Sequence, residues 1–199
     1  QAAGFYHAYK GSASPPPIAA VIGDSTYFHA GIPPTINALV TGARFVLVIL
    51  DNATTAMTGH QPTPATGFTA NDYEGRTLHL EDILKGCGVH TVLVHDPYDV
   101  KGFRKAVKEA YAKTASEGVA AVIARHPCIR DKKARAAQKT FRMEITDRCR
   151  LCGYCIREFE CPALAEGEDR VSIDMTLCIG CGVCADVCPH HAIIAGGEK

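Results

Sequence analysis

The feature that most constrains this chain is a concentration of cysteines near its C-terminal end. Eight of the ten cysteines in the 199-residue sequence fall between positions 149 and 188. They form two runs, CRLCGYCIREFECP from position 149 and CIGCGVCADVCPHHA from position 178. The second run has the form C-x2-C-x2-C-x3-C-P, in which tight turns aim neighbouring thiolates at one centre. This spacing predicts iron-sulfur ligation.

The spacing also predicts which cysteines act together. In runs of this kind from bacterial two-cluster ferredoxins, three cysteines bind one [4Fe-4S] cluster and the fourth binds the other. We therefore expect a first ligand set of Cys149, Cys152, Cys155 and Cys188, and a second set of Cys178, Cys181, Cys184 and Cys161. The first run departs from the pattern, because five residues, 156–160, precede Cys161 instead of three. That longer arm concerns the geometry of Cys161 and not the number of ligands.

Disulfides and zinc are the alternative interpretations of these cysteines. No signal peptide opens the sequence, and the C-x2-C pairs are too tight for a set of structural disulfides. Two four-cysteine zinc sites remain open, although zinc explains poorly the third cysteine and the closing Cys-Pro. Cys87 and Cys128 lack ligand spacing, so we expect them to be small buried apolar side chains. His190 and His191 could donate hydrogen bonds to a cluster, but a solvated tail is the simpler interpretation.

The part of the chain before the cysteines alternates apolar runs with helical patterns. Strands are expected at 18–22, 44–50, 89–94 and 118–124, and helices at 1–9, from 31 onward, at 80–85 and at 99–116. In the helix from 31, Pro33 and Pro34 fit the first turn, and Ile36, Leu39 and Val40 should form the buried face. This order predicts an α/β domain with a parallel sheet at 1–125, a linker at 126–142, and a small α+β ferredoxin-like domain at 143–199.

Charge separates the two parts of a chain that is neutral overall. Residues 1–142 carry 16 Lys and Arg against 11 Asp and Glu, whereas residues 143–199 carry 5 against 10. An acidic cluster domain suits docking to redox partners, and ordinary solvated surface explains the same charges equally well. There is no basic patch for nucleic acid, and the longest apolar run, Phe45 to Leu50, is too short to span a bilayer. Reduced cysteines imply a cytoplasmic location.

A second candidate site lies where two of the expected strands end. Gly23, Asp24 and Ser25 follow the first strand, and Asn52 follows the next, 28 residues after Asp24. Ligands bind beyond the carboxyl ends of strands in open α/β sheets. Asp24 and Asn52 both offer the oxygen ligands that Mg2+ prefers. The triplet and its spacing resemble the thiamine diphosphate signature, and that resemblance adds the backbone carbonyl of Thr54 as a third Mg2+ ligand.

The long Thr-, Pro- and Gly-rich loop at 53–72 supplies further candidates. Met57, Thr58, Gly59 and Gln61 are expected to shape this loop over the diphosphate, and amides near Ser25 to meet its charge. His29 and His60 could face the substrate and are the two candidate catalytic residues. Lone histidines are more often structural.

Taken together, GDSTYFHAGI, LDNATTAMTGHQPTP and the cysteine runs resemble the large (alpha) subunit of indolepyruvate:ferredoxin oxidoreductase. The resemblance covers essentially the whole sequence and implies the C-terminal part of that subunit. It implies three kinds of cofactor: thiamine diphosphate, Mg2+ and two [4Fe-4S] clusters. The pyrimidine-binding domain and the activating glutamate would lie elsewhere in the longer protein, so this chain should not be active alone.

The resemblance also implies a reaction and its partners. An aryl 2-oxo acid would be oxidatively decarboxylated, coenzyme A would accept the acyl group, and electrons would pass through the clusters to ferredoxin. The rest of the large subunit and a smaller beta subunit would complete the enzyme. The alternatives are a related oxidoreductase for pyruvate, a branched-chain acid or phenylglyoxylate, and a pure electron-transfer module. A non-redox thiamine decarboxylase is disfavoured, since it would have no use for two clusters.

Overall fold

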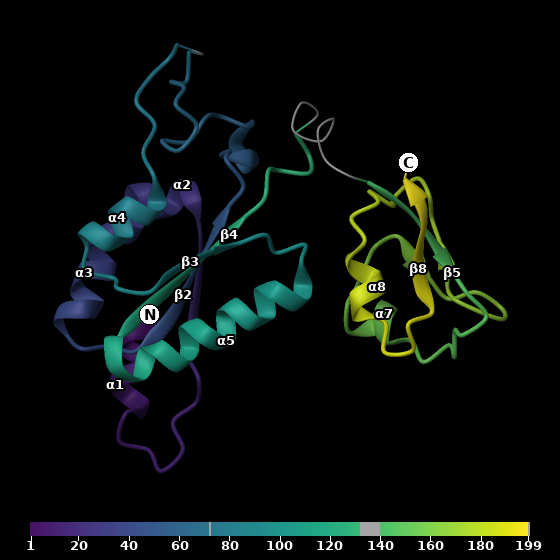
Figure 1. The fold of residues 1–199 in the computed structure, drawn as a ribbon, viewed down its shortest axis with the longest axis horizontal. Helices are drawn as coiled ribbons and strands as arrows, with labels where there is room; N and C mark the ends of the chain where they lie inside the picture. Colours follow the sequence, from purple (N-terminus) through teal and green to yellow (C-terminus); the bar gives the residue numbers. More distant parts are fainter. Residues whose placement is uncertain (72, 132–139, 199) are drawn as a thin grey trace. The chain divides into compact units, whose positions relative to one another are not determined.

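The computed structural model describes residues 1–71, 73–131 and 140–198, which form two compact units (Figure 1). The larger unit contains the N-terminal part of the chain and the smaller unit contains its C-terminal part. Residues 132–139 of the expected linker at 126–142 lie outside the described residues. Within the described ranges, no helix combines the length and the apolar character needed to cross a membrane.

The larger unit is built on a four-stranded parallel sheet, as the sequence predicted. Its strands are β1 (Ala19–Gly23), β2 (Phe45–Asp51), β3 (Val92–His95) and β4 (Val119–Arg125), in the order β1-β2-β4-β3. β2 and β4 occupy the centre and are buried on both faces, which explains their continuous apolar sequences. Gly23 pairs with Leu50 in the register, and Asp51 pairs with Arg125. The carboxyl ends of β1, β2 and β4 therefore meet at one edge.

Helices cover both faces of this sheet (Figure 1). The helical segments are α1 (Ala2–Tyr9), α2 (Asp24–Thr26), the π-helical turn η1 (Tyr27–Gly31), α3 (Ile32–Val40), α4 (Leu80–Gly86) and α5 (Val100–Glu117). On one face, Tyr27, Leu80 and Leu84 pack with the Phe45, Leu47 and Ile49 side of β2. On the other, Ala106 and Ala110 of α5 pack with Val46 and Val48. This alternation makes β2 the common wall of two cores.

The buried face of α3 differs from the expected one. Pro33 and Pro34 do lie in its first turn, but Ile36 is 44% exposed and Val40 is 80% exposed. Thr35 and Ala38 are buried instead, and the Thr35 hydroxyl donates to the Gly31 carbonyl at 2.8 Å. Small side chains let α3 approach the sheet closely, so the larger Ile36 and Val40 lie on the opposite face. The prediction of their burial was wrong, whereas Leu39 is half-buried against the core.

The smaller unit is a compact α+β arrangement. β5 (Phe141–Ile145) pairs antiparallel with β8 (Ile193–Glu198), and β6 (Leu164–Ala165) pairs antiparallel with β7 (Ser172–Ile173). Two short helices, α7 (Tyr154–Arg157) and α8 (Val183–Val187), follow the two cysteine loops. The core combines aliphatic side chains with cysteines, and its buried members are Met143, Cys155, Leu164, Val171, Cys184, Cys188, Ala192 and Ile193. The expectation of a small ferredoxin-like α+β fold is confirmed.

A glycine in η1 tests the packing that leads from the β1 edge into α3. A Cβ at Gly31 would lie within 3 Å of the ring of Tyr27, which is fully buried. We expect G31A to lower the free energy of unfolding by about 1–3 kcal/mol, because the ring has no room to move. Chemical denaturation of the two proteins measures the difference.

Gly86 of α4 provides the matched control, since a Cβ there would meet nothing within 4 Å. G86A should leave stability unchanged or raise it by up to about 1 kcal/mol, as alanine favours helix. Equal effects of the two substitutions would contradict the packing described for Tyr27.

Candidate cofactor and cluster sites

The strand-end residues predicted from the sequence lie together at the carboxyl edge of the sheet. Gly23 is the last residue of β1, and Asp24 begins α2 directly after it. Because β1 and β2 are neighbours in parallel register, Asp24 lies beside the Asp51–Asn52 end of β2. A hydrogen bond from the Thr55 hydroxyl to Ser25 Oγ, 2.9 Å long, joins the loop after β2 to α2.

Asp24 is the most unusual side chain at this edge. It is 2% exposed, and its Oδ1 accepts the Ser25 backbone N–H at 2.8 Å. Its Oδ2 is buried and accepts no hydrogen bond from the described residues. The pKa of Asp24 rises from 3.8 to about 6, mainly because the carboxyl is buried and also because the Asp51 carboxylate lies nearby. The Ser25 N–H acts against this rise.

This orphaned oxygen tests whether the residues present fit a bound cation. A buried carboxylate oxygen without a donor is costly unless something positive meets it. A divalent cation would satisfy it, and Asn52 adds a second oxygen ligand of the kind that Mg2+ takes. The side-chain oxygens of Asp24 and Asn52 therefore fit a divalent cation.

Asp51 and Arg125 complete the edge and were not assigned a role from the sequence. Asp51 is 5% exposed, and its Oδ2 accepts a hydrogen bond from Arg125 Nε at 2.7 Å. The two terminal nitrogens of Arg125 bind the Glu81 carboxylate at 2.8 and 2.9 Å, which lowers the pKa of Glu81 and raises that of Arg125. The available signal was positional, since Asp51 and Arg125 each follow an apolar strand run directly.

The loop after β2 is held by its own backbone. Asn52 Oδ1 accepts the Thr54 N–H at 3.0 Å, and Thr54 is buried. The segment after β4 supports the same loop, because the His126 N–H donates to the Asp51 carbonyl and the Cys128 N–H to the Asn52 carbonyl. The predicted ligand loop is therefore fixed on both sides.

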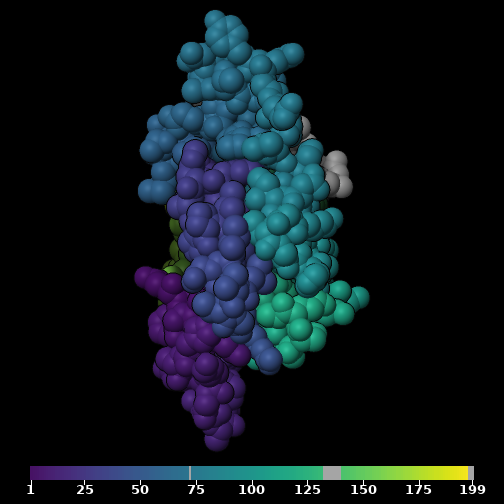
Figure 2. Space-filling model, turned by 90° about the vertical axis from the view of Figure 1, so that its left-hand side faces the viewer, coloured from purple at the N-terminus to yellow at the C-terminus, as the bar shows by residue number. Residues whose placement is uncertain are grey.

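The rest of the loop gathers at one end of the larger unit, beyond α3 and α4 (Figure 2). A short 3-10 turn, η2 (Ala56–Thr58), contains Met57 and Thr58, and both side chains are exposed. Gly59 follows it at φ 122°, a left-handed conformation that favours glycine. Gln61 closes the turn, because its side chain bonds the Thr58 hydroxyl at 2.6 Å and the Thr58 carbonyl at 2.7 Å.

The two candidate catalytic histidines are both exposed. His29 lies on η1, and His60 lies in the loop at a positive φ of 62°. His60 Nε2 is 4.0 Å from Cys128 Sγ. Cys128 and Cys87 were expected to be small buried apolar side chains, and the structure shows both to be half-buried. Each lies beside polar backbone, Cys87 at the end of α4 and Cys128 against the ligand loop, and not in a core.

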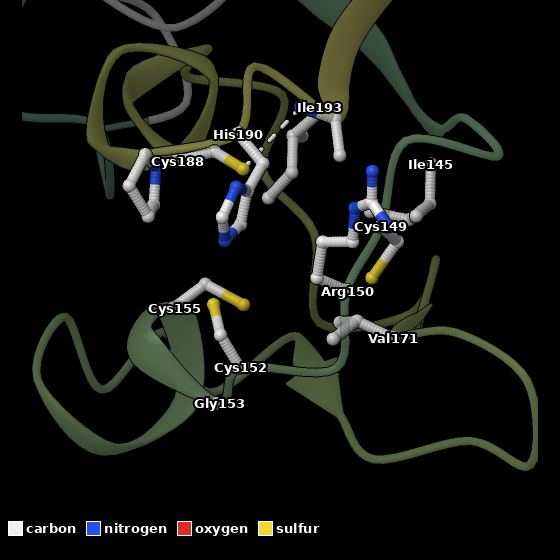
Figure 3. A pocket seen from close by; sticks show the side chains of 12 residues that line it. Ile145, Cys149, Arg150, Cys152, Gly153, Cys155, Val171, Cys188, His190 and Ile193 are labelled. Carbon is white, nitrogen blue, oxygen red and sulfur yellow. Dashed lines mark hydrogen bonds between the residues drawn. The ribbon is translucent and has the colours of Figure 1, made fainter.

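The first predicted cysteine set lines a single pocket in the smaller unit (Figure 3). Cys149, Cys152, Cys155 and Cys188 all contribute to its wall, with apolar Ile145, Val171 and Ile193. Arg150 and His190 also line it, and both are exposed to solvent elsewhere on their surface. Cys188 Sγ accepts the Ala192 N–H at 3.3 Å, an interaction of the kind that orients a thiolate ligand.

The second predicted set also lies together. The pKa of the Cys184 thiol is raised to about 12, by burial first and then by the neighbouring thiols of Cys181, Cys161 and Cys178. In the same way the pKa of Cys155 is raised by burial first, and then by Cys188, Cys152 and Cys149. Each buried cysteine is thus surrounded by the partners that the spacing assigned to it. Across the described residues, no three His, Cys, Asp or Glu side chains converge closely enough to hold a single metal ion.

The longer arm before Cys161 still brings that cysteine to the second set. The Phe159 N–H donates to the Tyr154 carbonyl after α7, and Glu160 then turns the chain at φ 54°. These turns take up the extra length between Cys155 and Cys161.

Comparison with known proteins matches both units to families. Residues 2–124 match the family described as "Thiamine pyrophosphate enzyme, C-terminal TPP binding domain", and residues 171–194 match "4Fe-4S binding domain". The resemblance predicted from the motifs is confirmed, and the chain carries a thiamine diphosphate-binding domain and a 4Fe-4S binding domain.

Several whole proteins are similar over most of this chain. An Archaeoglobus fulgidus protein named "Indolepyruvate oxidoreductase subunit IorA" is 50% identical over 178 residues, which is 88% of this chain and 28% of the relative. A Methanothermobacter marburgensis protein of the same name is 42% identical over 182 residues, 92% of this chain and 29% of the relative. "Hydrogenase-4 component A" of Escherichia coli is 38% identical over 45 residues, 23% of this chain and 22% of the relative. The chain spans less than a third of the length of the first two relatives.

The raised pKa of Asp24 predicts a cost in the cofactor-free protein. Between pH 3.8 and about 6 the folded state binds this proton more readily than the unfolded chain, so this group's contribution to stability falls as pH rises through about 6. At pH 8 we expect D24N to raise the free energy of unfolding, by at most about 3 kcal/mol, because the buried charge is removed. Denaturation of the cofactor-free protein at pH 5 and pH 8 measures this.

Asp82, exposed in the first turn of α4, provides the matched control. D82N should change stability by less than about 0.5 kcal/mol at both pH values. A D24N protein that is less stable than the wild type at pH 8 would contradict the strain assigned to Asp24.

Proposed function

Because the chain belongs to the thiamine pyrophosphate enzyme family through its C-terminal TPP binding domain, we propose that it is part of a 2-oxo acid:ferredoxin oxidoreductase acting on an aryl 2-oxo acid such as indolepyruvate. The observation that carries the proposal is the combination of two sites in one chain. A buried carboxylate with an orphaned oxygen lies at the sheet edge, and two cysteine sets lie in the smaller unit. The names of two similar proteins supply the substrate class.

In this proposal the sheet edge holds Mg2+ and the diphosphate of thiamine. Asp24 and Asn52 would bind the ion through side-chain oxygens, and Thr54 through its backbone carbonyl. Gly23 leaves room beside the carboxylate, because a Cβ there would meet nothing within 4 Å. Amides near Ser25 would meet the diphosphate, while Met57, Thr58 and Gly59 shape the loop beside it. The bound cofactor supplies carbanion chemistry on the 2-oxo acid.

The protein residues around this edge would orient and protect the cofactor. Arg125 fixes the Asp51 carboxylate at 2.7 Å, so Asp51 cannot turn away from the end of β2. His126 and Cys128 fix the backbone of the ligand loop. His29 and His60 are proposed to face the substrate from the exposed rim. Their role would be to hold or move a proton at the imidazole nitrogens.

The smaller unit would receive the electrons on two [4Fe-4S] clusters. Cys149, Cys152, Cys155 and Cys188 would bind the first, and Cys178, Cys181, Cys184 and Cys161 the second. Electrons would leave to ferredoxin, and coenzyme A would take the acyl group. We place the enzyme in the cytoplasm. The thiamine diphosphate-binding domain would end at residue 125, the cluster domain would begin at residue 143, and a linker would join them.

The remaining parts of the enzyme would come from other polypeptide segments. These are the rest of the large subunit, with the glutamate that activates thiamine, and a smaller beta subunit. This chain would then be inactive by itself.

The assembled oxidoreductase tests the thiamine part of the proposal. Thiamine diphosphate should bind only with Mg2+, and D24A should reduce its affinity at least a hundredfold, since the ion loses its buried carboxylate. Isothermal titration calorimetry measures the affinity, and D82A is the matched control. Unchanged binding by D24A would defeat the site assignment and favour a pure electron-transfer module.

Metal analysis and turnover test the rest. Anaerobic preparations should contain about eight irons for each copy of this chain, whereas about two zincs would contradict the cluster assignment. Aryl 2-oxo acids should be turned over faster than pyruvate, a branched-chain acid or phenylglyoxylate with ferredoxin as acceptor. The opposite preference would assign the enzyme to one of those substrates.

A further inference from the structure

The two cysteine loops are copies of one another, and their positions can be compared one to one. Cys178, Cys181 and Cys184 follow Cys149, Cys152 and Cys155 at a constant offset of 29 residues. The helices α7 and α8 begin at matched positions, and each is preceded by a glycine with left-handed backbone, Gly153 at φ 72° and Gly182 at φ 80°. Leu151 and Gly180 also share a positive φ, of 48° and 74°.

The copies differ in charge at these matched positions. The first loop carries Arg148, Arg150 and Arg157 where the second carries Leu177, Ile179 and Asp186. The residue after the closing Cys-Pro differs too, because His190 of the first site corresponds to Ala163 of the second. Three cationic side chains therefore accompany the first cysteine set and none occupies the equivalent positions of the second.

Contacts place several of these groups at the first cluster site. Arg150 and His190 line the same pocket as the four cysteines of that set (Figure 3). Arg157 Nη2 donates to the Cys152 backbone carbonyl at 2.6 Å, which holds its guanidinium against the loop. At the second site, the equivalent Ile179 is half-buried and Ala163 is buried, and neither brings charge.

A neighbouring cation changes the energy of a cluster in a known direction. Reduction adds one negative charge to a centre that already carries four thiolates, so positive side chains stabilise the reduced form and raise the reduction potential. Arg150 is exposed, so solvent and salt weaken but do not remove its effect. Each set contains buried cysteines, Cys155 and Cys188 in the first and Cys184 in the second. Cys152 of the first set is exposed, and solvent exposure also favours the more charged reduced form.

We infer that the two clusters are unequal, and that the cluster on Cys149, Cys152, Cys155 and Cys188 has the higher reduction potential. This inference rests on the proposed function, since it requires both clusters. When a single electron enters the pair of clusters, the first cluster is the one reduced at equilibrium. It is therefore the acceptor when an electron passes between the two clusters. Arg150 is not a ligand of the cluster. Its positive charge raises the reduction potential of the cluster nearby.

Redox titration of the assembled oxidoreductase, followed by low-temperature electron paramagnetic resonance, tests the inference. The wild type should show two midpoints. R150I should lower only the higher one, with about a tenfold fall in the reduced-to-oxidised ratio at a fixed ambient potential, or 59 mV for a one-electron couple. The reciprocal I179R should raise only the lower midpoint, and R150K should leave both in place because the charge is kept.

The outcomes separate this inference from the proposed function. Full iron content with two equal midpoints, or a higher midpoint that R150I does not move, would overturn the inference alone. If R150K lowered the higher midpoint potential as much as R150I does, the charge argument would be overturned, because a change in packing would then be the cause. Absence of iron from the wild type would overturn the cluster assignment and the inference with it.

Discussion

The larger unit depends on one unfavourable contact, the burial of the Asp24 carboxylate beside that of Asp51. Two adjacent acids in a poorly solvated position repel one another, and the structure compensates only one of them. Arg125 neutralises Asp51 and is itself held by Glu81 of α4. Asp24 has no such cation among the described residues, and its Oδ1 accepts the Ser25 backbone N–H. The parallel register brings both acids to one edge of the sheet, and their proximity raises the pKa of Asp24.

Much of this was readable from the sequence, because local patterns determine it. Apolar runs bounded by polar residues predicted the four strands and a parallel sheet, and Gly-Asp-Ser with Asn52 predicted a site at the carboxyl ends of two strands. The burial of α3 was not readable, since it depends on how closely the helix approaches the sheet through Thr35 and Ala38. The role of Arg125 was not predicted either, because it also depends on tertiary structure. Its partner Asp51 is 74 residues away, and only the pairing of β2 with β4 brings them together.

In the smaller unit, most of the site was predictable from local sequence spacing. Cysteine spacing predicted the two sets, and the thiols of Cys155 and Cys184 each lie near the three cysteines assigned to the same set. The five-residue arm before Cys161 could not be judged from spacing, because the outcome depends on the backbone turn at Glu160. Gly153 and Gly182 turn the two cysteine loops in the same way. The cysteine spacing and the backbone conformation therefore repeat in both loops, whereas the charged side chains around them differ.

The orphaned oxygen of Asp24 has a consequence for the life of the protein in a cell. A folded state that is strained when empty and relieved by its ligand is stabilised by mass action as the ligand is supplied. Molecules that never acquire the cofactor would unfold more often and be removed first by proteases. The amount of folded protein would then depend on the supply of thiamine diphosphate, without a separate regulatory protein. In the proposed function, Asp24 would then both bind the metal ion and destabilise the molecules that lack it.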